Sequence, residues 1–196
     1  MRKTRRALGM ILLLAGLWPG AARAHDPLEI GATVYVQTNR VEMTVVLMRK
    51  TIMRITERQG VHLLDFSRPE ERDEALPVLR AQGAGLFDLN CGTNMLHTAP
   101  AEAIIGKEDH VGFKLSYPLP ETRTTNDTLR FDARLLGHLP ADEGYGVSVV
   151  VLDMANGKVT AQKVLNASDH TVEIALPMLP GPANTARVGM KSPTVE

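Results

Sequence analysis

Cysteine is nearly absent from this sequence. Cys91 is the only cysteine among 196 residues, so the chain cannot close an internal disulfide. A disulfide-stapled scaffold is therefore excluded, and the stability of the fold has to come from a hydrophobic core. With residues 1–24 set aside, for reasons given below, 172 residues remain, which is enough for one domain of ordinary size.

Long apolar runs and aromatic side chains are also scarce. The apolar stretch from Ala7 to Trp18 has twelve residues, whereas a membrane-spanning helix takes about 20. We therefore expect no stable insertion into a membrane after this stretch is removed. Aromatic residues make up 4% of the chain, and its one tryptophan lies in that stretch. This composition argues against a sugar-binding surface built from exposed rings.

The chain lacks an excess of basic residues. Lys plus Arg and Asp plus Glu each number 22. Five of the basic residues and none of the acids fall within residues 1–24, so residues 25–196 have 17 basic and 22 acidic side chains and a net charge of −5. Nucleic acids and anionic membrane surfaces attract positively charged proteins. We therefore expect neither of them as a partner.

Motifs of the common enzyme classes are missing. The sequence contains no Gly-x-Ser-x-Gly, His-Glu-x-x-His or Ser-x-x-Lys motif, no Walker loop and no dinucleotide-binding glycine fingerprint. Acids cluster within residues 70–74, but at a predicted helix start, where they would complement the helix dipole. Asp153 and Asn156 flank a predicted hairpin turn and are interpreted as turn formers. These observations favour a protein that is not an enzyme.

The N-terminus has the pattern of a cleavable export signal. Basic residues at positions 2–6 precede the apolar stretch, Pro19 and Gly20 break it, and Ala22-Arg23-Ala24 has the small-x-small pattern that signal peptidase reads. We expect residues 1–24 to be a signal peptide and the protein to be periplasmic or secreted. Thr4-Arg5-Arg6-Ala7-Leu8 resembles a bacterial twin-arginine export signal. An ordinary secretory signal is the alternative.

Period-two alternation of apolar residues runs through much of the remaining chain and predicts half-buried strands. Val147, Val149 and Val151, for example, are expected on one buried face. Asn156-Gly157 is typical of a two-residue hairpin turn. Counting gives seven to nine strands, and we predict a mainly β fold, an immunoglobulin-like β-sandwich over residues 25–176. The expected strands are residues 28–37, 41–48, 86–90, 101–105, 110–117, 129–135, 145–151, 159–165 and 171–176.

A segment with helical spacing interrupts this alternation. Residues 51–59 have the spacing of a helix. Ser67-Arg68-Pro69-Glu70 then fits a capping box with proline in the first turn, which predicts a second helix that ends near Gly83. Pro77 lies inside this helix and should kink or split it. We predict a helical insert over about residues 51–85.

The C-terminal residues 177–196 are rich in proline and glycine and contain few apolar side chains. Segments of this composition rarely bury enough surface to order themselves. We predict a flexible tail.

His25 is the sharpest candidate for chemistry. Cleavage after Ala24 would make it the first residue, and its free amine and imidazole could then chelate copper(II), which favours such nitrogen ligands. The alternative is that this histidine is only a polar start of the mature chain. A second histidine would complete the site, and the sequence offers five: His62, His97, His110, His138 and His170.

Cys91, Met95 and His97 form a second candidate metal site. They lie within seven residues, and a thiolate, a thioether and an imidazole together suit copper(I). The order of the three residues does not match a blue-copper loop. The alternative, which we favour, is a buried cysteine and methionine beside a surface histidine.

Two short segments resemble the exported N-terminal β-domain of bacterial HupE/UreJ-type proteins. They are the mature start, Ala24-His25-Asp26-Pro27 with the hairpin after it, and Gly144-Tyr145-Gly146-Val147 leading into the Asn156-Gly157 hairpin. That family is associated with nickel or cobalt handling. This chain has none of its membrane helices, so the resemblance implies a stand-alone periplasmic β-domain and not a transporter.

These observations together predict a non-enzymatic exported β-domain that binds a protein partner or a small ligand. The alternative is a periplasmic copper-binding protein that uses His25.

Overall fold

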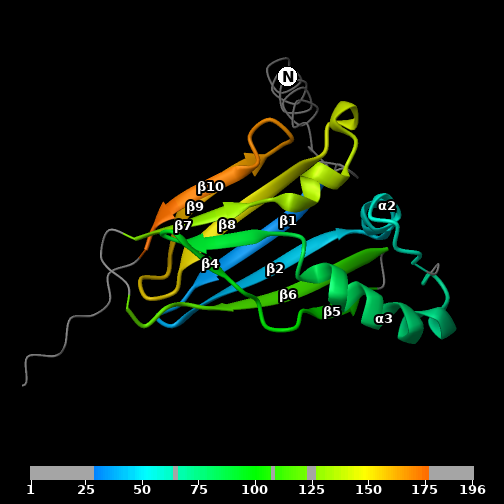
Figure 1. The fold of residues 1–196 in the computed structure, drawn as a ribbon, viewed down its shortest axis with the longest axis horizontal. Helices are drawn as coiled ribbons and strands as arrows, with labels where there is room; N and C mark the ends of the chain where they lie inside the picture. Colours follow the sequence, from blue (N-terminus) through cyan, green and yellow to red (C-terminus); the bar gives the residue numbers. More distant parts are fainter. Residues whose placement is uncertain (1–28, 64–65, 107–108, 123–126, 177–196) are drawn as a thin grey trace, which may run out of the picture.

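The chain folds into two β-sheets with two helices packed at one side (Figure 1). The structure is a computed structural model, and it describes residues 29–63, 66–106, 109–122 and 127–176. The mainly β fold and its helical insert are confirmed. The predicted signal peptide, His25 and the predicted tail lie outside the described residues. Among the described residues, no helix combines the length and apolarity needed to cross a bilayer.

The larger sheet has six strands in the order β5-β6-β2-β1-β8-β9. Strands β1 and β2 form the predicted antiparallel hairpin, and β1 pairs in parallel with β8, which comes more than a hundred residues later in the chain. The strands are β1 Glu29–Val36, β2 Arg40–Met48, β5 Glu102–Ile105, β6 His110–Pro118, β8 Gly146–Asp153 and β9 Lys158–Leu165.

The smaller sheet has four strands in the order β10-β7-β3-β4. They are β3 Asp88–Cys91, β4 Asn94–Leu96, β7 Thr128–Asp132 and β10 Thr171–Ala175. Strand β4 was not predicted, and it raises the count to ten, one more than the upper expectation. Residues 133–135, expected to continue a strand, instead enter the 3-10 helix η1, Arg134–His138. A second 3-10 helix, η2, spans Ala141–Glu143.

The core lies between the two sheets and under the helices. The strands of the larger sheet alternate as predicted: Val147, Val149 and Val151 of β8 are all buried, as are every second residue of β1, β2 and β6. Phe113 of β6 and Phe131 of β7 come from opposite sheets, and both are fully buried. Apolar burial on this scale is the main stabilising term of such a domain.

The helical insert consists of α2, Arg49–Arg58, and α3, Pro69–Gly83. Helix α3 lies close to the inner face of the larger sheet, because a Cβ at Gly83 would come within 2.7 Å of Phe113 Cδ1 and 2.8 Å of Ala101 Cβ. Glycine is the residue that permits this approach.

Two local expectations about turns and caps were wrong. Arg68, not Ser67, is the N-cap of α3, and its side chain does not cap the helix. Of the two outcomes expected at Pro77, a kink or a split, the split does not occur: α3 continues through this exposed residue to Gly83. The hairpin between β8 and β9 has a four-residue loop, residues 154–157, with Gly157 at φ 63°.

Candidate functional site

The larger sheet has one face that no described helix or strand covers, which we call the outer face. The buried residues of the sheet point to the other side, where Figure 1 places the smaller sheet and α3. The register of the strands defines the outer face. Its residues are Gly31, Thr33, Tyr35, Arg40, Glu42, Thr44, Val46, Met48, Glu102, Ile104, His110, Gly112, Lys114, Ser116, Pro118, Gly146, Ser148, Val150, Leu152, Val159, Gln162 and Val164.

Apolar side chains are exposed across the full width of the outer face. Val46 on the central strand β2 is 39% exposed, Ile104 on the edge strand β5 is 43% exposed, and Val159 and Val164 on the other edge strand, β9, are 57% and 63% exposed. Single exposed apolar residues are common, but four on one sheet face indicate a surface with a binding role.

Two glycines on the outer face leave room beside Val46. Gly31 and Gly112 are its cross-strand partners on either side. A Cβ at Gly31 would meet nothing within 4 Å, and one at Gly112 would meet only Ile104 at 3.9 and 4.0 Å. Neither residue lies at a bulge in its strand pairings. Glycine weakens a strand interior and often marks a place where another chain approaches closely.

The other end of the outer face is polar and hollowed. A pocket of about 500 Å³ opens there, a volume within the roughly 300–1,000 Å³ that is typical of small-molecule sites. Its charged groups are already paired, because Arg40 Nε lies 2.8 Å from Glu42 Oε1 and Lys114 Nζ lies 3.7 Å from Glu102 Oε2. The outer face therefore has no net charge. The pocket is lined by Tyr35, Glu42, Met43, Thr44, Pro100, Glu102, Lys114, Leu115 and Ser116.

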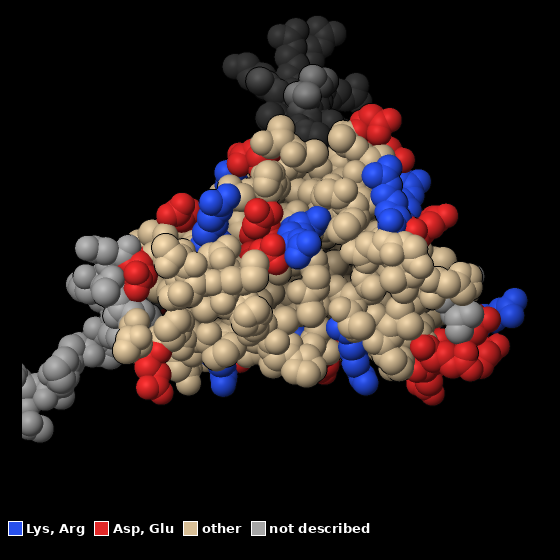
Figure 2. Space-filling model, viewed as in Figure 1, with Lys and Arg blue, Asp and Glu red and all other residues tan. Residues whose placement is uncertain are grey.

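The opposite side of the molecule looks different. Figure 2 shows charged side chains spread around the side formed by the smaller sheet and α3. Its acidic cluster lies over the start of α3, where Glu70, Glu71, Asp73 and Glu74 occur. Glu70 and Glu71 are in the first helical turn, as predicted, where they complement the helix dipole.

A second candidate region lies where β8 begins and β9 ends. Arg54 of α2 donates a hydrogen bond to the Tyr145 hydroxyl at 2.7 Å and forms an ion pair with Glu143 of η2. The hydrogen bond with Glu143, together with the charge of Tyr145 when ionised, raises the pKa of Arg54 above its ordinary value. These contacts join α2 to the segment that enters β8.

Two neighbouring pockets open beside this segment. One, of 520 Å³, is lined by η1, η2 and the loop of residues 166–168. The other, of 380 Å³, shares Leu136 and Ala167 with it and is lined by His138, His170 and Asp132. His170 Nε2 lies 3.7 Å from Asp132 Oδ2. The structure thus brings two of the five candidate histidines to one pocket.

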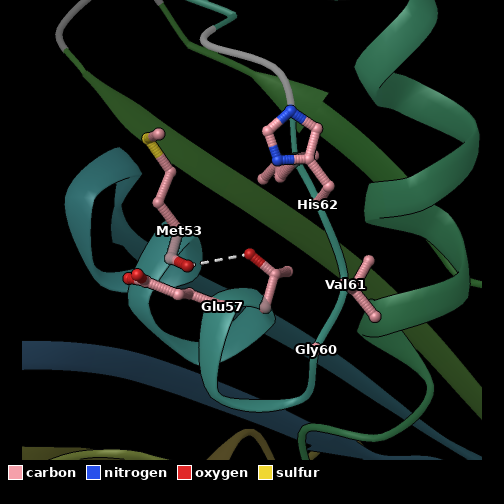
Figure 3. Close-up of a pocket in the computed structure, with 7 residues that line it drawn as sticks. Met53, Glu57, Gly60, Val61 and His62 are labelled. Carbon is pink, nitrogen blue, oxygen red and sulfur yellow. Dashed lines mark hydrogen bonds between the residues drawn. The ribbon is translucent and has the colours of Figure 1, made fainter.

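A fourth pocket, of 420 Å³, lies at the end of α2 and contains His62 (Figure 3). Glu57 and Met53 of α2 also line it, and the Thr56 hydroxyl donates a hydrogen bond to the Met53 carbonyl at 2.8 Å. The hydroxyl therefore already has a backbone partner. Among the described residues, no group of three His, Cys, Asp or Glu side chains could hold a metal ion, here or elsewhere.

The three residues of the proposed copper(I) site are not brought together on one face. Cys91 is buried, whereas Met95 is 51% exposed and His97 is exposed. Met95 pairs with Asn90, one residue before Cys91, so the two sulfur side chains point to opposite faces of the smaller sheet. The alternative was a buried cysteine and a buried methionine beside a surface histidine. The positions of Cys91 and His97 agree with it, but Met95 lies on the surface.

One residue of the outer face was a candidate from the sequence: His110, a possible partner of His25, which pairs with Met48 at the start of β6. The apolar residues and glycines of this face were not among the predicted functional residues. The signal that could have identified it was the pair of glycines, Gly31 and Gly112, at polar positions of otherwise regular strands. No known family model matches the chain, and a search of curated proteins found no significant match.

Proposed function

We propose that this protein is an exported, non-catalytic binding domain that holds a protein partner on the outer face of its six-stranded sheet. The observation that carries the proposal is the exposure of Val46, Ile104, Val159 and Val164 on a face without net charge. A broad, open sheet face suits a protein surface, whereas a small molecule favours an apolar cavity and the pocket on this face is lined largely by polar side chains. Protein interfaces likewise have apolar centres depleted of charge.

Export is part of the proposal. The basic, apolar and small-x-small segments of residues 1–24 support it, as does the resemblance to the exported domain of HupE/UreJ-type proteins. The intact mass of the protein recovered from the periplasm tests it. We expect a chain that starts at His25; a chain that retains Trp18 would contradict the cleavage.

Site-specific photo-crosslinking in living cells tests the binding face. A crosslinking side chain at Val150, on the outer face, should give a covalent adduct with a partner, whereas one at the exposed Glu173 of the smaller sheet should not. Val46→Lys should abolish the Val150 adduct, because it places a charge in the apolar centre. Equal adducts from both positions, or no effect of Val46→Lys, would overturn the proposal.

Copper binding by His25 is the second candidate, and the positions of His138 and His170 favour it. Glu29 pairs with Gly146 at the start of β8, next to Gly144 and Tyr145 of the 520 Å³ pocket. The histidines line the 380 Å³ pocket, which shares Leu136 and Ala167 with it. His25 is four residues before Glu29, a reach of at most about 14 Å. Since two histidines alone make an incomplete site, the amine and imidazole of His25 would supply the remaining nitrogen ligands.

Titration calorimetry with copper(II) on three proteins tests this candidate. The mature chain should bind one equivalent, whereas His25→Ala and a chain with one alanine placed before His25 should not. The affinity should fall as the pH drops below about 7.7, because copper then competes with the proton of the α-amine. Equal binding by all three proteins would remove His25 from the site.

A further inference from the structure

We infer that the partner on the outer face is a second copy of this chain, related by a twofold axis that runs parallel to the strands between β1 and β2. This inference rests on the proposed function and names its partner. Such an axis places β1 of one copy over β2 of the other, β8 over β6 and β9 over β5. Residues that lie side by side across the sheet have the same height along the strands, which we call one level. The axis leaves this height unchanged, so residues at one level face each other between the copies. The two sheets would pack with aligned strands, about 10 Å apart.

At the apolar end the two copies are complementary in shape. Gly31, Val46, Ile104 and Val164 lie at one level of the sheet. The axis therefore places each Val46 over the open position at Gly31 of the other copy, where a Cβ would have met nothing within 4 Å. It also places the exposed Val164 on one edge strand over the exposed Ile104 on the other. Both contacts occur twice, as a twofold interface requires.

At the polar end the same axis pairs hydrogen-bonding groups. Tyr35 lies at the level of Glu42, its cross-strand partner, so the phenol of one copy would face the carboxylate of the other. Gln162 lies at the level of Glu102 through β8, β1, β2 and β6, and the two would face each other in the same way. A hydrogen bond to a carboxylate is stronger than one between neutral groups.

Charge and size also suit a second copy. The proposed mature chain has a net charge of −5, which would oppose self-association through most surfaces, but the charges of the outer face cancel within each copy. Five strands of eight or nine residues, with the four-residue β5 at one edge, cover at most roughly 24 by 26 Å. The accessible surface of such a face approaches the ~800 Å² per partner of a stable interface.

The oligomeric state of the mature chain, residues 25–196, tests the inference by analytical ultracentrifugation over a wide range of concentrations. We expect a dimer. Gly31→Lys should raise its Kd by at least about 100-fold, because the new side chain fits the monomer but takes the space of the other copy's Val46. Gly137→Lys is the matched control: a Cβ at Gly137 also meets nothing within 4 Å, but this residue lies in η1, away from the outer face, and the dimer should persist.

Cysteine crosslinking tests the axis. Val164 and Ile104 lie on opposite edge strands with four strands between them, so a short bifunctional thiol reagent can join the cysteines of a Val164→Cys/Ile104→Cys chain only between copies. Facing positions of two packed sheets are too far apart for a direct disulfide but within reach of a reagent about 8 Å long, and we expect a covalent dimer. Val159→Cys/Ile104→Cys, in which the two cysteines lie at different levels, should give none.

A monomer at every concentration would overturn the second copy as partner. So would a dimer that Gly31→Lys leaves intact, or equal crosslinking of the two cysteine pairs. The proposed function has its own test. It fails if the crosslinking side chain at Val150 gives only the adducts that one at Glu173 also gives. A Val150 adduct to a different protein would retain the binding face and replace the partner.

Discussion

The inner and outer faces of the six-stranded sheet consist of alternate residues of the same strands, yet they differ in what covers them. On the inner face Ile30, Val34 and Val45 are fully buried beneath the smaller sheet and the helices. On the outer face Val46, the next residue after Val45, is 39% exposed. The residue type is the same, and only the direction of the side chain differs.

This difference shows why an apolar residue in a strand has no fixed meaning by itself. On the inner face it stabilises the monomer by burial, at about 1.5–3 kcal/mol for a fully buried valine or leucine. On the outer face the same side chain has little to stabilise within one chain. A group of such side chains on one face therefore supports the proposed contact outside the chain.

The largest expected effect comes from placing one charge on each face of β8. Val149 is buried on the inner face and Val150 points to the outer face. Val149→Asp should destabilise the fold by on the order of 4 kcal/mol or more, because it buries an unpaired carboxylate. Val150→Asp should cost about 1 kcal/mol or less.

Thermal melting of the two variants measures this contrast. At about 2–4 °C per kcal/mol for a domain of this size, Val149→Asp should lower Tm by on the order of 10 °C. If Val149→Asp does not fold at all, the folded state of Val150→Asp still decides the matter. Similar losses in both variants would mean that the outer face is covered within the monomer.

A smaller effect is expected from adding a methyl group to one glycine at each face: Gly83 of α3, which contacts the inner face, and Gly31 on the outer face. At Gly83 the new Cβ would lie 2.7 Å from Phe113 Cδ1, and this ring is fully buried and cannot move freely. Gly83→Ala should therefore destabilise the fold by about 1–3 kcal/mol. Gly31→Ala has open space and should leave the stability unchanged or raise it by about 0.5 kcal/mol.

Urea unfolding of both alanine variants, at a concentration where the chain is monomeric, measures these changes. An equal loss of stability at both positions would show that neighbouring atoms also crowd Gly31.

The inner face was predictable from the sequence because period-two alternation is a local property. The β1–β2 hairpin and the buried face of β8 followed from it directly. Features that depend on fine local energetics did not follow. Arg68 occupies the N-cap position of α3 where Ser67 was expected, and the turn at Gly157 has four residues where two were expected. Strand β4, with three residues, is too short for its alternation to be recognised.

The candidate site was not predictable, because it depends on which strands become neighbours. Val46 and Val164 are more than a hundred residues apart in the sequence, and they reach one level of the sheet only because β1 pairs in parallel with β8. Similarly, His138 and His170 reach one pocket through the fold of the smaller sheet. The sequence contains the residues of both sites, but it does not show which of them become neighbours. The long-range order of the strands determines that.

The smallest expected change in stability at neutral pH comes from removing one tyrosine hydroxyl on each face. Tyr117 is 1% exposed on the inner face, and its hydroxyl donates a long hydrogen bond of 3.4 Å to the Phe87 carbonyl; Tyr35 lies on the outer face. Tyr117→Phe should cost less than about 1 kcal/mol at neutral pH, because a bond of this length is weak. Tyr35→Phe should have no measurable effect on the monomer.

Alkaline pH separates the two tyrosines clearly. Burial, with a further contribution from the carboxylate of Asp88, raises the pKa of Tyr117 above its ordinary value of about 10. The folded state thus favours the neutral phenol, and this stabilisation is complete below pH 10 and is lost as the pH rises from there towards the folded pKa. The free energy of unfolding should fall by up to about 1.4 kcal/mol per pH unit above 10 on this account. Urea titrations at a series of pH values should show that Tyr117→Phe removes this part of the decline and Tyr35→Phe does not; parallel curves for the two variants would mean that Tyr117 can reach water and ionise in the folded chain.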